Sequence, residues 1–131
     1  MSGTGTRPAV VVADDDDDIA SILAETLRAD GIDPVLVSNG ALVVDAVIDS
    51  GARLLILDVQ LPGASGIDVY DLVRNQPALA NIPVLFVTAN PELARGTIRG
   101  RAPREVMAKP FDVGALADKV RELLRAEIAA A

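Results

Sequence analysis

Five short apolar runs punctuate the chain, and most of them show no alternation of apolar and polar residues. AVVVA, LLIL and VLFV are continuous aliphatic or aromatic runs, a pattern typical of strands that are buried on both faces of a parallel sheet. We predict strands at Ala9–Ala13, Pro34–Val37, Leu54–Asp58, Val84–Thr88 and Glu105–Ala108. The segments between these strands are long enough for the helical crossovers that parallel strands need.

The intervening segments show apolar residues at helical spacing. In the first segment Ile19, Ile22, Leu23 and Leu27 form the apolar stripe, and Gly31 is the expected stop. Further helices are predicted at Ala41–Ser50, Ser65–Arg74, Pro91–Arg99 and from Asp112 to about Ala129. The helix at 91–99 is the weakest because glycines interrupt it. Alternating strands and helices predict an α/β protein, (βα)5, with an open parallel sheet covered by helices on both faces.

The composition narrows the class of protein. A chain of 131 residues fits one domain, which we place at residues 8–129, after a polar and disordered N-terminal end at 1–7. Half of the residues are apolar and only three are aromatic, so the core must be aliphatic. Cysteine and histidine are absent from the sequence, which excludes disulfides, thiol or histidine catalysis and the common zinc sites.

The formal net charge of −7 disfavours a nucleic-acid partner. No apolar run approaches the roughly 18 residues of a membrane span, and the N-terminus lacks the apolar stretch of a signal peptide. We therefore expect a cytoplasmic protein that binds neither nucleic acid nor a membrane.

Four of the five predicted strands end in, or are directly followed by, a polar residue that could bind a ligand or take part in a reaction. Asp14 and Asp15 follow the first strand, Asp58 ends the third, Thr88 ends the fourth and Lys109 follows the fifth. Since ligands of open α/β sheets bind beyond the carboxyl ends of the strands, we expect these side chains to share one edge.

Three crowded carboxylates repel one another, and a hard divalent cation relieves that repulsion. Mg²⁺ prefers oxygen ligands and keeps positions free for a phosphate. A carboxylate is also a phosphoryl acceptor, and phosphoryl transfer needs positioning and charge neutralisation more than it needs histidine. The cluster therefore predicts a Mg²⁺-dependent phosphoryl site, with Lys109 and Thr88 available to phosphoryl oxygens.

Four segments in this order, VVVADDDDDI, LLILDVQLPGASG, VLFVTA and AKPF, resemble the receiver domain of two-component response regulators over roughly residues 7–127. The resemblance implies a flavodoxin-like three-layer sandwich whose parallel sheet has the strand order 2-1-3-4-5. It also implies a stand-alone receiver whose partners are a sensor histidine kinase or histidine phosphotransfer protein and an output protein of unknown identity.

The resemblance assigns a role to each site residue of this sequence. Asp58 would be the phosphoacceptor, and Thr88 and Lys109 would hold the phosphoryl oxygens. Mg²⁺ would be bound by the carboxylates of Asp15 and Asp58 and the backbone carbonyl of Gln60, with Asp14 acting through a bound water. The Lys109–Pro110 bond is a candidate cis peptide bond. Such a protein is not a turnover enzyme, because its chemistry is confined to phosphorylation and dephosphorylation of its own Asp58.

The sequence departs from the family at Val106, where receivers usually have Tyr or Phe three residues before the lysine. Valine has neither ring nor hydroxyl, so we expect Thr88 to act directly on the order or position of residues 89–104. The departure also keeps open a phosphate-independent, receiver-like interaction module. A Mg²⁺-dependent phosphohydrolase with an aspartate nucleophile is a second alternative, although Asp58-Val59-Gln60 lacks the second aspartate of the D-x-D-x-T/V motif.

Overall fold

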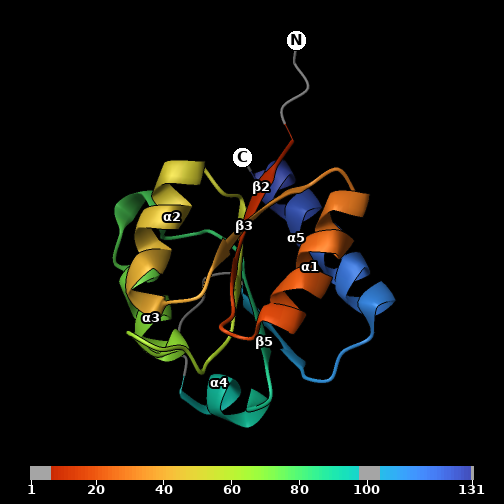
Figure 1. Ribbon diagram of the computed structural model, residues 1–131. Helices are drawn as coiled ribbons and strands as arrows, with labels where there is room; N and C mark the ends of the chain where they lie inside the picture. The colour runs from red at the N-terminus through yellow and green to blue at the C-terminus, as the bar shows by residue number, and fades with distance from the viewer. Residues whose placement is uncertain (1–6, 98–103, 131) are drawn as a thin grey trace.

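The computed structural model describes residues 7–97 and 104–130, and these contain a five-stranded parallel sheet (Figure 1). The strands are β2 (Ala9–Ala13), β3 (Asp33–Val37), β4 (Leu54–Leu57), β5 (Val84–Thr88) and β6 (Arg104–Ala108). Their spatial order is β3-β2-β4-β5-β6, which is 2-1-3-4-5 in order along the chain. The predicted strands agree with the observed ones to within one residue, and the implied flavodoxin-like order is confirmed.

Helices cover both faces of the sheet. They are α1 (Asp17–Ala29), α2 (Val43–Ser50), α3 (Gly66–Arg74), α4 (Pro91–Thr97) and α5 (Val113–Ala130). Residues of α2, α3 and α4 pack on one face, and residues of α1 and α5 pack on the other (Figure 1). Two 3-10 turns, η1 (Gly40–Leu42) and η2 (Pro77–Leu79), were not predicted, and η1 replaces the first turn of the predicted 41–50 helix. No helix among the described residues is long and apolar enough to cross a membrane.

The strand register sorts the core into two layers. Val12 of β2 lies between Leu36 of β3 and Ile56 of β4, and Ile56 pairs in turn with Leu85 of β5. Because side chains alternate along a strand, Val10, Val12, Ile56 and Leu85 face α1 and α5. Their neighbours Val11, Leu55, Leu57 and Phe86 face α2 and α3. The core is aliphatic apart from Tyr70 and Phe86, whose ring centroids are 5.5 Å apart.

The run of aspartates leads directly from the sheet into α1. Asp16 is the N-cap, and its side chain accepts hydrogen bonds from the backbone N–H groups of Asp18 and Ile19 at 3.0 and 3.2 Å. Asp17 and Asp18 lie in the first turn, where negative charge favours the helix dipole. Gly31 follows the helix with φ +74°, which confirms the predicted stop.

One sequence expectation about an apolar stripe needs correction. Ile22 of α1 was predicted on the apolar stripe of its helix, but its exposed fraction is 41%, and Leu42 of η1 is 59% exposed. In α4, Ala94 is buried while Leu93 is 45% exposed, so this short helix has few apolar anchors.

Val106 pairs with Phe86 of β5 and packs against the core layer of α2 and α3. It therefore serves as a stiff strand residue, as its branched side chain predicts. We expect Thr88 to change the order or position of residues 89–104. Residues 98–103 of that segment, Ile98 among them, lie outside the described part of the chain.

The core predicts a large difference between two leucine truncations. Leu55 is fully buried in β4, and Leu55→Ala should lower the free energy of unfolding by about 2–5 kcal/mol because it leaves a cavity. Leu72 on α3 is 50% exposed, so Leu72→Ala should change it by no more than about 0.5 kcal/mol. Urea denaturation of both variants measures the difference, and equal losses would contradict the assigned core.

Candidate functional site

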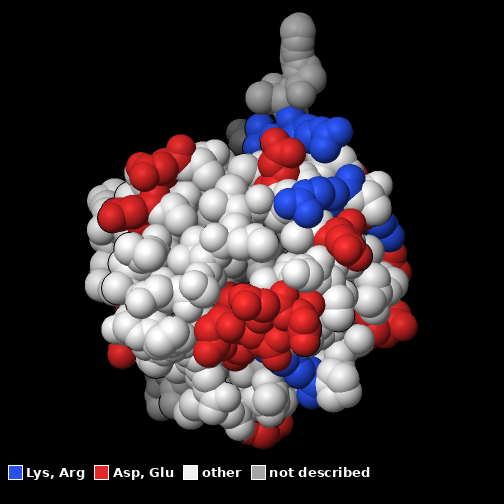
Figure 2. Space-filling model, viewed as in Figure 1, with Lys and Arg blue, Asp and Glu red and all other residues white. Residues whose placement is uncertain are grey.

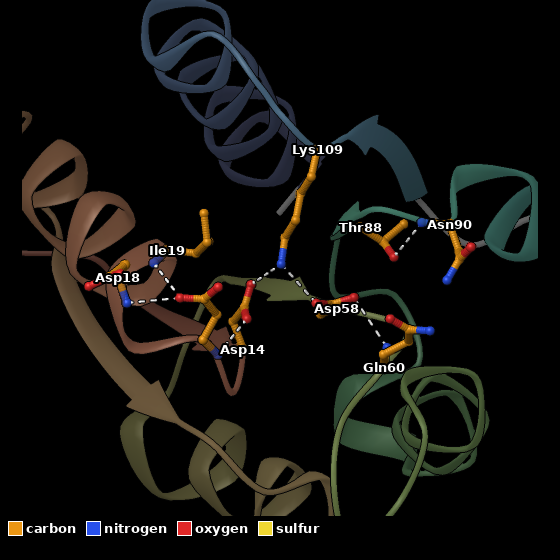
Figure 3. A network of polar contacts seen from close by, with 9 residues as sticks. Asp14, Asp18, Ile19, Asp58, Gln60, Thr88, Asn90 and Lys109 are labelled. Atoms are coloured by element: carbon orange, nitrogen blue, oxygen red, sulfur yellow. Dashed lines mark hydrogen bonds and ion pairs between the residues drawn. The ribbon is translucent and has the colours of Figure 1, made fainter.

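Three strands deliver the site residues to the carboxyl edge of the sheet. Asp14 and Asp15 follow β2, Asp58 follows the neighbouring β4, and Lys109 follows β6. The strand order separates β6 from β4 by β5, and the long side chain of Lys109 spans that distance to the two acids (Figure 3). The predicted grouping of these residues at one edge is therefore observed.

Lys109 forms ion pairs with two of the acids. Its Nζ donates to Asp14 Oδ2 at 2.7 Å and to Asp58 Oδ2 at 2.8 Å. The side chains of Asp14 and Asp58 are only 3% and 8% exposed, so both ion pairs are shielded from water. The Lys109–Pro110 peptide bond that follows is cis, as the resemblance implies.

Each buried carboxylate has a second hydrogen bond from the backbone. Asp14 Oδ1 accepts from the N–H of Asp16 at 3.0 Å, and Asp58 Oδ1 accepts from the N–H of Gln60 at 3.1 Å. One oxygen of each acid thus faces Lys109 and the other faces the loop that follows its own strand. This arrangement fixes the orientation of both carboxylates, since the two oxygens have different partners.

Burial and charge shift two of these groups from their ordinary pKa values. Desolvation raises the pKa of Asp14 above 3.8, and the hydrogen bonds from Lys109 and Asp16 offset only part of that rise. Desolvation lowers the pKa of Lys109, but hydrogen bonds and attraction from Asp14 and Asp58 outweigh it, so that the pKa lies above 10.5. Lys109 is therefore a permanent cation at neutral pH.

The three acids have the donor set of a divalent-cation site. One carboxylate oxygen from each of Asp14, Asp15 and Asp58 can be chosen so that all lie within 4.8 Å of one another. Asp15 is exposed, whereas the other two are buried, so the group opens to solvent on one side. Figure 2 shows acidic side chains gathered at this place, where β2 leads into α1. Oxygen-only donors suit Mg²⁺.

These acids lie in a cleft of about 530 Å³. Its walls are formed by Asp14, Asp15, Asp16, Asp58, Gln60, Leu61, Pro62, Ala89 and Lys109. The sequence predicted Gln60 but not Leu61, Pro62 or Ala89, because nothing in an apolar or small side chain indicates a site. Their positions directly after Asp58 and Thr88 were the available signal.

Thr88 lies beside the cleft and is not among the residues that form its wall. Its side chain is fully buried, and its Oγ1 accepts a hydrogen bond from the N–H of Asn90 at 3.1 Å (Figure 3). Its backbone carbonyl accepts from the N–H of Lys109 at 2.9 Å. The structure therefore brings Thr88 next to the site residues but directs its hydroxyl oxygen to the start of α4.

The chain resembles proteins of a known family. The family model of the response regulator receiver domain matches residues 10–121. Among curated proteins, the DNA-binding response regulator MtrA of Mycolicibacterium smegmatis is 33% identical over 121 residues, which are 91% of this chain and 51% of MtrA. The chain thus spans about half the length of the curated relatives it matches.

Solved structures show the same fold over most of the chain. A response regulator structure from Chloroflexus aurantiacus is 25% identical with a TM-score of 0.81, covering 92% of this chain and 99% of that one. The response regulator protein TrrA of Thermotoga maritima is 27% identical with a TM-score of 0.77, covering 88% and 98% of the two chains.

The raised pKa of Asp14 predicts a pH dependence of stability in metal-free buffer. As pH rises through 3.8 the unfolded chain loses this proton first, so the free energy of unfolding falls until the pH exceeds the folded-state pKa. Asp14→Asn removes this contribution while keeping the shape of the side chain. Its stability relative to the unsubstituted protein should therefore improve between pH 3.5 and pH 7, as followed by urea denaturation with EDTA. A pH-independent difference would contradict the assigned burial of charge.

Proposed function

Because this chain belongs to the response regulator receiver family, we propose that it is a phosphoacceptor receiver that takes a phosphoryl group from a phosphohistidine onto Asp58. The observation that carries the proposal is the bridge from Lys109 to Asp14 and Asp58, at 2.7 and 2.8 Å, with Asp15 in the same cleft. Together these residues provide an acceptor, a fixed cation and a set of oxygen ligands for a metal.

The chemistry is a transfer between two nucleophiles. An Asp58 carboxylate oxygen attacks phosphorus, the phosphorus–nitrogen bond of the donor breaks, and its electron pair stays on the imidazole. The Lys109 ammonium lies 2.8 Å from Asp58 Oδ2 and is placed to neutralise the charge on the phosphoryl oxygens. Thr88 would add a hydrogen bond from its hydroxyl group.

The carboxylates of Asp15 and Asp58 and the carbonyl of Gln60 would hold Mg²⁺, with Asp14 acting through a water. When bound, Mg²⁺ supplies charge neutralisation at the acceptor and the phosphoryl oxygens. The cluster of three carboxylates within 4.8 Å supports this assignment. The structure of TrrA, a relative at 27% identity, is a complex with Mg²⁺–BeF, which supports it further.

Partners follow from the reaction and from the relatives. A phosphohistidine donor implies a sensor histidine kinase or a histidine phosphotransfer protein. The signal would pass to an output partner or by onward phosphotransfer. The curated relatives carry about as much chain again as the part matched here. The proposed output is the binding of a partner protein in the cytoplasm.

A phosphate-independent interaction module is the alternative that Val106 favours, because this strand residue packs in the core and has no ring to reorient. A Mg²⁺-dependent phosphohydrolase is disfavoured, since Gln60 stands where such enzymes need a second aspartate. Phosphorylation without turnover of a small phosphate ester separates the proposal from both.

The first test concerns the acceptor. Incubation with acetyl phosphate and Mg²⁺ should add one phosphoryl group, detected as intact mass. Asp58→Asn should abolish the addition, because an amide oxygen is a far weaker nucleophile than a carboxylate. Asp18→Asn, an exposed acid in the first turn of α1, is the matched control and should be labelled like the unsubstituted protein. Unchanged labelling of Asp58→Asn would refute the assignment.

The second test concerns the metal ligands. Asp15→Ala should lose most of the Mg²⁺ affinity because it removes a direct carboxylate. Asp14→Ala should lose roughly 10–100-fold, as for groups that orient a ligand. Calorimetric titration with MgCl₂ measures both, and Asp17→Ala removes an equal charge from α1 without touching the cluster. If Asp15→Ala binds Mg²⁺ as tightly as Asp17→Ala, the ligand set is wrong.

A further inference from the structure

The loop between β4 and α3 forms one wall of the cleft through Gln60, Leu61 and Pro62. Its two ends are well anchored. Gln60 N–H donates to Asp58 Oδ1, and the N–H of Gly66 donates to the carbonyl of Val59 at 2.7 Å. The middle of the loop, from Leu61 to Ala64, needs an anchor from elsewhere if its position is to be fixed.

That anchor is the turn after β3, which is formed by Asn39 and by Gly40, the first residue of η1. The N–H of Gly40 donates to the carbonyl of Pro62 at 2.8 Å, although the two residues belong to different crossovers. Gly40 is buried, and its backbone lies directly against the loop. A Cβ at position 40 would sit 2.0 Å from the carbonyl oxygen of Ala64, which is backbone and cannot rotate away.

A second contact locks the same two segments. A Cβ at Gly63 would sit 2.0 Å from Asn39 Oδ1, and Gly63 has φ +85°. Asn39 Oδ1 is held in place because it accepts a hydrogen bond from the N–H of Ala41 at 2.8 Å. Each segment thus contributes one glycine whose missing side chain admits the other segment. We name this pair of contacts, Gly40 on Ala64 and Asn39 on Gly63, the turn–loop clamp.

We infer that Asn39 and Gly40 are positioning residues for the metal site, because the turn–loop clamp holds the wall that carries Gln60. The inference rests on the proposed function, since it assigns the clamp to the Mg²⁺ site of that function. Neither residue lines the cleft, and both act through the backbone of Pro62, Gly63 and Ala64. The consequence is that Mg²⁺ affinity depends on a turn that follows the edge strand β3.

The test is calorimetric titration of Gly40→Ala with MgCl₂. The added methyl forces the turn and the loop apart, and Mg²⁺ affinity should fall roughly ten-fold, at the lower end of the range for groups behind a metal ligand. The matched control is Gly31→Ala, where φ is +74° but a Cβ meets no atom within 4 Å. Gly31 precedes β3 at the amino edge of the sheet, so this control loses stability without touching the cleft.

The outcomes separate the inference from the proposed function. If the unsubstituted protein binds no Mg²⁺, the proposed metal site fails and the clamp's role fails with it. If it binds Mg²⁺ and a folded Gly40→Ala binds equally well, only the inference is overturned. An equal loss of affinity in Gly31→Ala would also overturn it, because the effect would then follow from stability alone.

A double-mutant cycle keeps the inference testable if Gly40→Ala does not fold. Gly63→Ala should weaken Mg²⁺ binding, and adding Asn39→Ala should recover part of the loss, since it removes the oxygen that the new Cβ meets. Recovery supports the clamp. Strictly additive effects on Mg²⁺ affinity would overturn it.

Discussion

The edge of the sheet carries three carboxylates and one ammonium within a few ångströms, and this imbalance of charge governs the site. Lys109 compensates the two buried acids, Asp14 and Asp58, by hydrogen bonds of 2.7 and 2.8 Å. Without it, two ionised groups would face each other in a largely desolvated place, at a cost of several kcal/mol. Asp15 is left to solvent. The excess of negative charge and the oxygen donors of these three acids therefore suit one further hard cation.

Such a charge arrangement requires a rigid support. The support is the central part of the sheet, where β2, β4 and β5 are buried on both faces by aliphatic side chains. The end of each of these strands is therefore held in place, because the strand packs between two neighbouring strands and two helical layers. The loops are held differently. Gly40 and Gly66 allow backbone to touch backbone, with a Cβ at Gly66 placed only 2.1 Å from the carbonyl oxygen of Asp58. The missing side chains of these glycines thus allow the loops to pack directly on neighbouring backbone.

Most of the fold, and the grouping of the site residues at one edge of the sheet, could be predicted from the sequence. Continuous apolar runs predict buried parallel strands, and a polar residue directly after a run must lie at the carboxyl edge, so the sequence predicts that Asp14, Asp58 and Lys109 lie close together. Side-chain direction was harder to predict. Ile22 fits a helical stripe, yet its exposed fraction is 41%. The contact of Gly40 with Ala64 joins two crossovers, and no local pattern encodes a contact between distant backbones. The hydroxyl oxygen of Thr88 is directed towards Asn90 by a hydrogen bond from the backbone N–H, and no sequence pattern encodes that contact.

The hydroxyl of Thr88 is hydrogen-bonded to the residue that precedes α4, whereas Val106 has neither ring nor hydroxyl with which to make such a contact. Thr88 Oγ1 accepts from the N–H of Asn90, which immediately precedes Pro91 at the start of α4. A hydroxyl group can accept one hydrogen bond and donate another, so the bond from Asn90 leaves the hydroxyl proton of Thr88 able to donate. Both interactions use the same atom. Any displacement of Oγ1 towards Asp58 therefore lengthens its bond to Asn90 or draws the start of α4 with it. Since α4 buries only Ala94 among its described apolar side chains, little packing opposes such a shift.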